Sequence, residues 1–359
     1  MGGQNSIDSK HARVRLELKK SVFVPGETIS GKVHLQVLIP FEPKTLFVQL
    51  KGKENTFWHE MYFEDKTAIK SEFMPRMSSI RHRGEKNTIV KKQFPVCEWD
   101  SELAIGGHSI PFKLTIPEGL PGSIQYHKHP IKAEINYELS TFIKVPFKIS
   151  NSSLITIRQP PFSQSAHKLD RPVTQIRSLC QKTENVIKLS IQQQPEPYNP
   201  LEDINFSVEV NNSLSKIGLK GLTWKVYYMV ILSEENTENK DNKFFSCKPI
   251  LDGKVVRKVG AGQVAEGGNA VGVKISGFKQ YIEENPIIKS GLVEAVMYLT
   301  VVGIVDTMFG CFGQGPEVMG YLRIGPTFES NPIIPDKPEN WSAVKYHTVH
   351  LDDKADTEG

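Results

Sequence analysis

The feature that most constrains the fold of this chain is an alternation of apolar and polar residues with a period of two. In IKAEINYEL, residues 131–139, every second residue is apolar, and the residues between are Lys, Glu or Asn. Such strands belong to antiparallel sheets with one wet face, and two such sheets bury their apolar faces together. The same pattern recurs at 13–19, 28–37, 46–52, 108–116, 185–191, 204–210 and 222–228. The sequence therefore predicts an all-β fold of antiparallel β-sandwiches. The lack of a sustained, capped helical repeat disfavours an α/β fold.

The alternation divides the chain into parts. With 359 residues the chain is long enough for more than one hydrophobic core. Alternation stops near Arg158, where Pro, Ser and Gln collect, and Pro, Asp, Glu and Lys dominate after Pro326. We expect an N-terminal segment 1–12, a first sandwich 13–158, a linker 159–178, a second sandwich 179–325 and a mobile tail 326–359.

One apolar stretch, GLVEAVMYLTVVGIV at 291–305, needs to be weighed as a membrane helix. A membrane-spanning helix takes about 20 apolar residues. This stretch is shorter, contains Glu294, ends at Asp306 and is rich in β-branched residues. It predicts a buried strand.

The first sandwich contains an interruption in SVFVPGETISGKV, residues 21–33. Pro25 fixes φ, and Gly26 permits the positive φ of a type II turn, so we expect a corner between two antiparallel strands. Gly31 falls on the apolar face of the next strand, where it predicts a bulge or a close approach of another backbone.

Composition and motifs argue against several classes of function. The net charge of +4 is too small to indicate the dense basic face of a nucleic-acid-binding protein. The four cysteines are far apart and form no CxxC pair, which favours buried thiols in a reducing compartment. We expect a cytoplasmic location, because MGGQNSIDSK has no apolar signal region.

No residues stand out for catalysis or metal binding. GxSxG, HExxH and P-loop motifs are absent from the sequence. His127 and His129 lie near each other without a third ligand, so we interpret them as loop residues. The sequence predicts no enzyme activity, no cofactor and no metal site.

Three blocks in the first half carry a family resemblance. VFVPGETISGKVHLQV with TLFVQLKGKENTFWHE resembles the opening of an arrestin N-terminal domain. GGHSIPFKLTIPEGLPGSIQYH resembles its later Leu-Pro turn, and IKAEINYELSTFIKV resembles the strand that follows. The blocks occur in the family's order over most of 13–158 and are most similar to the α-arrestins (arrestin-domain-containing proteins). PYNPLEDINFSVEVNNSLS resembles the start of a second arrestin domain, with Leu201 in place of the family's Gly.

The resemblance implies two immunoglobulin-like arrestin domains and a non-enzymatic adaptor. Such an adaptor binds cytoplasmic tails of membrane-protein cargo and links them to endosomal trafficking or signalling machinery, at the plasma membrane or endosomes. The implied partners include trafficking adaptors or ubiquitin machinery, although no Pro-Pro-x-Tyr motif is present. The alternative is a constitutive coat or scaffold subunit that resembles the arrestin-fold component of retromer. Nothing in the sequence resembles the buried polar core of the receptor-binding arrestins, so their activation switch is not carried over.

Two features suggest contact with membranes. MGGQNS fits the N-myristoylation pattern at Gly2, although so short a pattern also matches by chance. The segment Tyr62–Val96 is rich in Lys and Arg, and basic residues contribute about 1 kcal/mol each at an anionic surface. The alternative for that segment is a solvated loop. Its candidate contacts with anionic lipids or acidic partners are Arg81, Arg83, Lys86, Lys91 and Lys92.

Two further candidates concern protein partners. The arrestin resemblance makes Lys19 and Lys20 candidates for phosphate contacts, and the alternative is an ordinary solvated strand end. Tyr346 to Val349, YHTV, has the form of a Tyr-x-x-apolar sorting signal, which a disordered tail could present to a partner groove. This pattern is common, so a chance match is the alternative.

Overall fold

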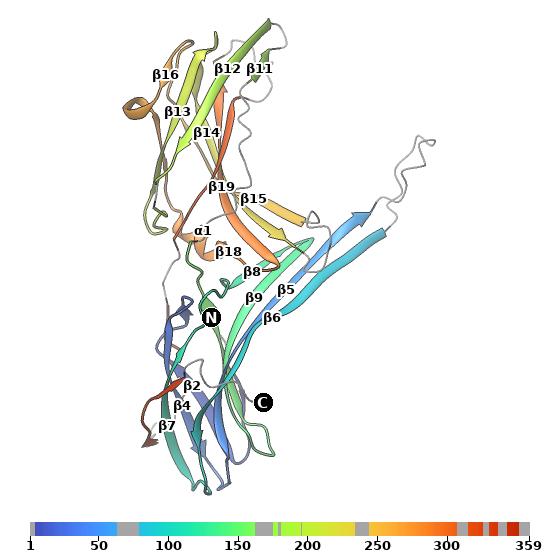
Figure 1. The fold of residues 1–359 in the computed structure, drawn as a ribbon, viewed down its shortest axis with the longest axis vertical. Coiled ribbons are helices and arrows are strands. Elements are labelled where there is room, and N and C mark those ends of the chain that lie inside the picture. The colour runs from blue at the N-terminus through green and yellow to red at the C-terminus, as the bar shows by residue number, and fades with distance from the viewer. Residues whose placement is uncertain are drawn as a thin grey trace.

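The structure is a computed structural model of the chain. It describes residues 4–62, 79–161, 175–178, 181–194, 196–233, 244–306, 315–325, 330–336 and 343–351. These residues form two β-sandwiches arranged end to end, and the second half of the chain makes the upper one in Figure 1. The predicted all-β fold is confirmed.

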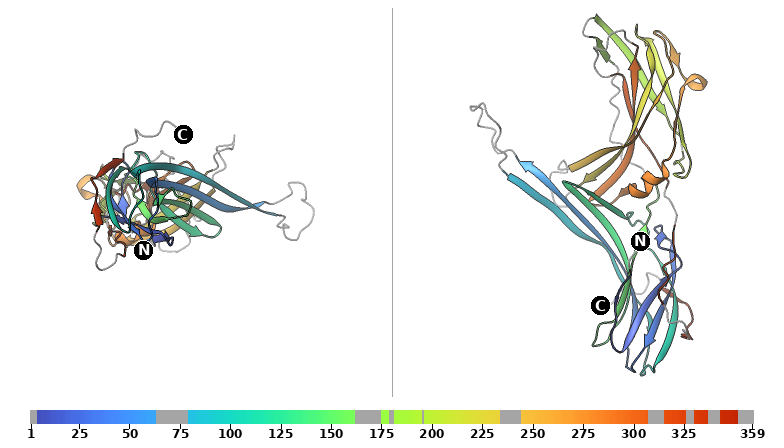
Figure 2. Two further views of the ribbon diagram at one scale, coloured as in Figure 1. Left: turned by 90° about the horizontal axis from the view of Figure 1, so that it is seen from below. Right: turned by 180° about the vertical axis from the view of Figure 1, so that it is seen from behind.

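The larger sheet of the first sandwich has the order β1-β10-β9-β5-β6, with β3 beside β10 and β8 beside β9. Its strands pair antiparallel except for β3 with β10. The hairpin of β5 and β6 continues well beyond the sandwich (Figures 1 and 2). The strands are β1 (Gln4–Ile7), β3 (Val22–Phe23), β5 (Thr45–Tyr62), β6 (Ser79–Glu98), β8 (Ile124–Lys128), β9 (Ile131–Ile143) and β10 (Ser150–Ile157).

The smaller sheet packs on the inner face of the larger one. It consists of β2 (Ala12–Leu18), β4 (Thr28–Val37) and β7 (Gly106–Thr115), followed by β21 (Ala343–Lys345) and β22 (Val349–Leu351). Its inward positions are those of the apolar alternation: Val14 and Leu16 are buried, as are Ile135 and Leu139 on the facing β9. The alternation of apolar and polar residues along each strand thus determines which side chains form the core.

The interruption at Pro25 is a corner between the two sheets. Gly26 has φ +81°, and the backbone N–H of Glu27 donates to the Val24 carbonyl at 3.1 Å, which confirms the type II turn. The turn connects β3, in the larger sheet, to β4, in the smaller one. At Gly31 a Cβ would lie 2.8 Å from the backbone carbonyl oxygen of Glu17 on β2, and 2.7 Å from Phe112 Cζ. The close approach is confirmed, and no bulge occurs there because the β2–β4 register is regular.

The second sandwich also has two sheets, ordered β11-β12-β13-β16 with β17 on β13, and β15-β14-β19-β18 with β20 on β19. In the described part of the chain, helix is limited to η1 (Gly267–Asn269) and α1 (Lys279–Glu284). The strands are β11 (Gln175–Ser178), β12 (Gln181–Gln192), β13 (Ile204–Leu214), β14 (Leu219–Leu232), β15 (Phe244–Val255), β16 (Val264–Ala265), β17 (Val271–Ile275), β18 (Ile288–Lys289), β19 (Val293–Val305) and β20 (Glu317–Tyr321).

The apolar stretch at 291–305 forms β19, so the predicted buried strand is confirmed. β19 pairs with β14 along its length, and Ala295, Met297 and Leu299 are fully buried. Across the described residues, none of the helices has the length and apolar character needed to span a membrane.

The C-terminal segment differs from the mobile tail that we expected. Ile333 and Leu18 exchange two backbone hydrogen bonds of 2.9 Å, and Ser330 Oγ accepts from the backbone N–H of Ser21 at 2.8 Å. Further along, β21 and β22 pair in parallel with β7. An edge strand such as β7 has unpaired backbone groups, which these short strands satisfy.

The predicted linker also contains a strand, because β11 lies within 159–178 and pairs with β12. The domain boundaries given above stay predictions.

Candidate functional site

The two sandwiches meet through a small set of polar contacts centred on Gln159, just after β10. Gln159 Oε1 accepts from the backbone N–H of Lys289 at 2.8 Å and of Gly122 at 3.4 Å. Its Nε2 donates to the Lys289 carbonyl at 3.3 Å. One side chain of the first sandwich therefore holds β18 of the second.

Aromatic residues extend this interface along β8 and β15. The hydroxyls of Tyr126 and Ser246 are 3.0 Å apart, and Lys248 Nζ lies 5.8 Å from the Tyr126 ring centre and 5.7 Å from that of Tyr228. Burial lowers the pKa of Lys248, the charge of Glu284 raises it, and that of Lys128 lowers it. On β5, the buried Glu54 carboxylate accepts a hydrogen bond from Ser290 Oγ of the second sandwich. The interface thus combines polar contacts with aromatic rings.

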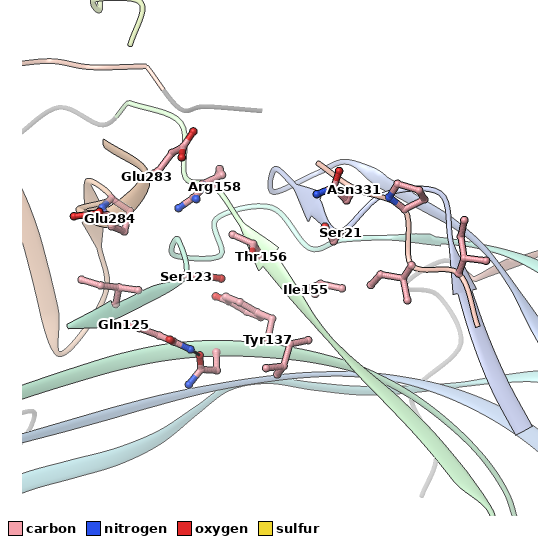
Figure 3. A pocket seen from close by; sticks show the side chains of 17 residues that line it. Ser21, Ser123, Gln125, Tyr137, Ile155, Thr156, Arg158, Glu283, Glu284 and Asn331 are labelled. Atoms are coloured by element: carbon pink, nitrogen blue, oxygen red, sulfur yellow. Dashed lines mark hydrogen bonds between the residues drawn. The ribbon is translucent and has the colours of Figure 1, made fainter. Parts of the chain in front are cut away.

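A cavity of about 790 Å³ opens beside this interface. This is within the range of small-ligand and peptide side-chain sites. β8, β9 and β10, α1 and the C-terminal segment 331–334 all contribute to its wall. Figure 3 shows Arg158, Glu283 and Glu284 toward one end, and Ile155, Ser21 and Asn331 toward the other.

Arg158 is the chemically distinctive residue of this cavity. Its backbone N–H donates to the Phe23 carbonyl at 2.8 Å, which ties the residue to the corner at β3. The side chain is half-buried, and its Nε has no hydrogen-bond partner among the described residues. Burial lowers the pKa of Arg158, and the charge of Glu283 opposes that shift. A guanidinium group that keeps its charge in a partly dry site favours an anionic partner.

The rest of the cavity supplies hydroxyl groups and apolar surface. Ser123 Oγ already accepts from the backbone N–H of Ile157 at 2.9 Å, and the Tyr137 hydroxyl donates to the Pro121 carbonyl at 2.8 Å. These two groups therefore hold the wall in place. Leu154 and Ile334 line the cavity as well and are 46% and 72% exposed, so one end is apolar and open.

Lys19 and Lys20 lie at the end of β2, directly before Ser21 of the cavity wall. Lys20 Nζ pairs with the Glu27 carboxylate and lies 5.1 Å from the centre of the Phe23 ring. Lys19 is exposed. Lys20 thus has partners in this conformation, and Lys19 is the freer cation of the two.

The structure does not bring the other predicted basic residues into one cluster. Lys86 and Lys91 are exposed on the outward face of β6, whereas Arg83 and Lys92 alternate onto the face that carries Trp58 and Leu50. For Arg81 only the backbone position in β6 is described.

Gly2 lies outside the described residues. Tyr346 is held rather than presented, since its hydroxyl is 3.2 Å from Trp99 Nε1 and 3.0 Å from His108 Nδ1. Val349 begins β22. In this conformation the sorting-type motif is part of the first sandwich.

His127 lies in β8 and not in a loop as we expected, whereas His129 lies in the β8–β9 turn, and both have ordinary partners. His127 Nε2 is 2.7 Å from Glu134 Oε1, and the His129 ring lies 5.4 Å from that of His59. Within the described ranges, no three His, Cys, Asp or Glu side chains gather closely enough to hold a metal ion.

The sequence reasoning missed Arg158, Gln159 and the two carboxylates of α1. Arg158 ends an apolar strand at a predicted domain boundary, which is the one local signal that could have marked it. Its neighbour Glu283 is remote in sequence, so only the fold brings them together.

Comparisons with known proteins agree with the fold of the first sandwich. Residues 12–159 match the sequence model of the arrestin (or S-antigen) N-terminal domain. Arrestin domain-containing protein 17 of Caenorhabditis elegans is 26% identical over 206 residues, which cover 55% of this chain and 46% of that protein.

Two Dictyostelium discoideum proteins also match. Arrestin domain-containing protein A is 28% identical over 117 residues, covering 33% of this chain and 20% of that protein. Arrestin domain-containing protein B is 26% identical over 205 residues, covering 55% of this chain and 30% of that protein. In each case the match spans less than half the length of the relative.

The family match covers the first sandwich from β2 to the end of β10 and includes Arg158 and Gln159. Together with the two-sandwich fold, it shows that the chain is an arrestin-like protein, similar to the arrestin domain-containing proteins.

Proposed function

We propose that this protein is a non-enzymatic adaptor that docks an acidic or phosphorylated segment of a membrane-protein tail between its two sandwiches. The observation that carries the proposal is Arg158, a half-buried guanidinium group in a cavity of about 790 Å³. The similarity to arrestin domain-containing proteins supports it.

The chemistry of the cavity suits binding rather than catalysis. Glu283 and Glu284 are exposed, and the hydroxyls of Ser123 and Tyr137 are engaged with the backbone. A bound phosphate or carboxylate would compete with Glu283 for Arg158. Lys19 is exposed two residues before Ser21 of the cavity wall and would supply a second positive charge to an anionic segment bound there.

The test is the affinity of the full chain for a phosphorylated tail peptide and its unphosphorylated form, measured by calorimetry. Hydrogen bonds between charged groups contribute about 1.5–3 kcal/mol, so Arg158→Gln should weaken phosphopeptide binding about 10- to 100-fold. Lys225→Gln, an exposed charge on the second sandwich, is the matched control and should bind like wild type.

Equal affinities of wild type and Arg158→Gln would contradict the proposal, provided that both unfold at the same urea concentration. Peptide binding that ignores phosphorylation and acidic residues altogether would also contradict it.

The link to trafficking machinery and a peripheral location at the plasma membrane or endosomes are further parts of this proposal. Myristoylation of Gly2 would supply one membrane anchor, and a single acyl chain binds only marginally. Flotation of wild type and Gly2→Ala with vesicles tests this part. If both float equally well, the acyl anchor is wrong.

A further inference from the structure

The outward face of the β5–β6 hairpin carries a cluster of cations that the cavity does not use. We call it the lysine face, defined by Lys51, Lys53, Lys86 and Lys91. Lys51 and Lys53 lie on β5, and Lys86 and Lys91 lie on β6. Lys53, Lys86 and Lys91 are exposed and Lys51 is half-buried. None of the four lines the cavity that contains Arg158.

The register of the two strands fixes the size of this cluster. Lys91 is directly opposite Lys51, Lys53 is two residues further along β5, and Lys86 is opposite Asn55. With a rise of about 3.3 Å per residue and about 4.8 Å between strands, the four Cα atoms span roughly 13 Å by 5 Å.

This arrangement is electrostatically unfavourable in the isolated protein. Like charges directly opposite on one face of a sheet destabilise it, as Lys51 and Lys91 do here. Within the part of the chain that the structure describes, none of the four lysines has a carboxylate within ion-pairing distance.

The carboxylates of this sheet face lie on β9, beyond β5. Glu138 is opposite Lys51, and Glu134 is opposite Asn55. Glu134 is already engaged, since its Oε2 lies 3.0 Å from Lys132 Nζ and its Oε1 lies 2.7 Å from His127 Nε2. Burial raises the pKa of Glu134, but hydrogen bonds from Lys132, Asn55 and His127 outweigh that effect and lower it. The positive charge of the lysine face is therefore not neutralised by Glu134.

The face ends in aromatic residues toward the far end of the hairpin. Phe57 follows Lys53 and Asn55 on the same side of β5, is 36% exposed, and its ring packs edge-on against His59 at 4.9 Å. Aromatic side chains beside Lys and Arg are typical of surfaces that lie at a membrane interface. This side of the sheet is accessible, because Lys53, Phe57, Lys86 and Lys91 are exposed.

We propose that the lysine face docks on an anionic lipid bilayer, with Phe57 at the level of the headgroups. Lysines on flexible stems, spread over two adjacent strands, suit an array of lipid phosphates and carboxylates, to which they are attracted without a fixed geometry. Membrane docking by the lysine face adds a lipid partner to the proposed adaptor role. This inference rests on the proposed function only for what the docking does in the cell.

The test is sedimentation of the purified full chain with phosphatidylcholine vesicles that contain or lack phosphatidylserine. Each basic residue near an anionic surface is worth about fivefold in binding. Replacing Lys51, Lys53, Lys86 and Lys91 by Gln should therefore lower binding to the anionic vesicles by about two to three orders of magnitude. Replacing the same four by Arg should preserve it.

The matched control replaces four exposed lysines of the second sandwich, Lys188, Lys225, Lys254 and Lys258, by Gln. Both variants lose the same net charge, and the control should sediment like wild type. Equal losses in the two variants would overturn the proposal, because net charge alone would then explain binding. Wild-type binding by the lysine-face variant would overturn it as well.

Peptide affinity in the same preparations separates this proposal from the adaptor role. Arg158→Gln should bind the phosphorylated peptide more weakly than wild type and bind the anionic vesicles as wild type does. The lysine-face variant should bind the vesicles more weakly and the peptide as wild type does. If the lysine-face variant loses only the peptide, the face belongs to a protein partner and the membrane proposal fails.

Discussion

Gly31 and Gly26 show at the residue scale why the corner of the first sandwich needs glycine at two places for two different reasons. At Gly31 a Cβ would meet Phe112 Cζ at 2.7 Å and the Glu17 carbonyl oxygen at 2.8 Å. At Gly26 space is open beyond Glu118, at 3.4 Å, but φ is +81°. The first position is restricted by packing and the second by backbone conformation.

We predict that Gly31→Ala destabilises the protein by about 1–3 kcal/mol, because the methyl group has to displace a backbone carbonyl or a buried ring. Urea denaturation measures the difference. Gly272→Ala is the control, since a Cβ there meets nothing within 4 Å and φ is not positive. A Gly31→Ala protein as stable as the control would contradict the packing observed at Phe112.

His108 is a second residue whose environment makes a measurable prediction. Burial lowers its pKa from the ordinary value of 6.5, and its Nδ1 faces the Tyr346 hydroxyl at 3.0 Å, with Trp99 alongside. Well above pH 6.5 both the folded and the unfolded state hold His108 neutral, so its titration has no effect on stability there. Below this pH the unfolded state binds the proton more readily.

Stability should therefore fall as pH drops below about 6.5, and more so in wild type than in His108→Gln. Urea denaturation at a series of pH values tests this. His347→Gln, exposed one residue after Tyr346, is the control and should follow wild type. If wild type and His108→Gln lose stability in parallel on acidification, His108 is not the titrating group.

At the scale of elements, the long strands could be predicted and the short ones could not. β9 and β19 carry a clear apolar pattern over 13 residues each, and both were predicted from it. β21 and β22 have three residues each, too few to show a period. β21 and β22 pair with β7 because the backbone N–H and C=O groups of an edge strand need hydrogen-bond partners. The polar composition of the tail gives no sign of this pairing.

The candidate site was only partly predictable for the same reason. Lys19, Lys86 and Lys91 were named from the sequence as candidate contacts with anionic partners, and the structure shows that they are exposed. Their role in binding stays a prediction. Arg158 depends on α1, a helix of six residues that starts without a side-chain cap, so no start signal marked it in the sequence. A cavity made by two sandwiches and a C-terminal segment is a property of tertiary structure alone.

At the scale of the whole molecule, the two sandwiches are held by few hydrogen bonds. Among the described residues, Gln159 makes two of them, both to Lys289, and a further hydrogen bond joins it to Gly122 of the first sandwich. Gly122 packs so closely there that a Cβ would lie 2.7 Å from Ile288. Interfaces of this polar kind permit relative motion of domains unless specific contacts oppose it.

We predict that Gln159→Ala loosens this contact, because two backbone N–H groups lose their acceptor. Small-angle X-ray scattering should show a broader distance distribution, and the stability of each sandwich should change little. Gln192→Ala removes an exposed side-chain hydrogen bond to Glu209 and is the control. An unchanged scattering profile for Gln159→Ala would show that other contacts fix the two sandwiches.

Hydrogen exchange of the full chain, with and without a phosphorylated tail peptide, tests the central claim most directly, since it locates the docking site. We predict protection at the cavity wall, in Ser21–Phe23, Ile124–Lys128, Leu154–Arg158 and α1, and loss of this protection in Arg158→Gln. Protection confined to strands that do not line the cavity, with none around Arg158, would contradict it.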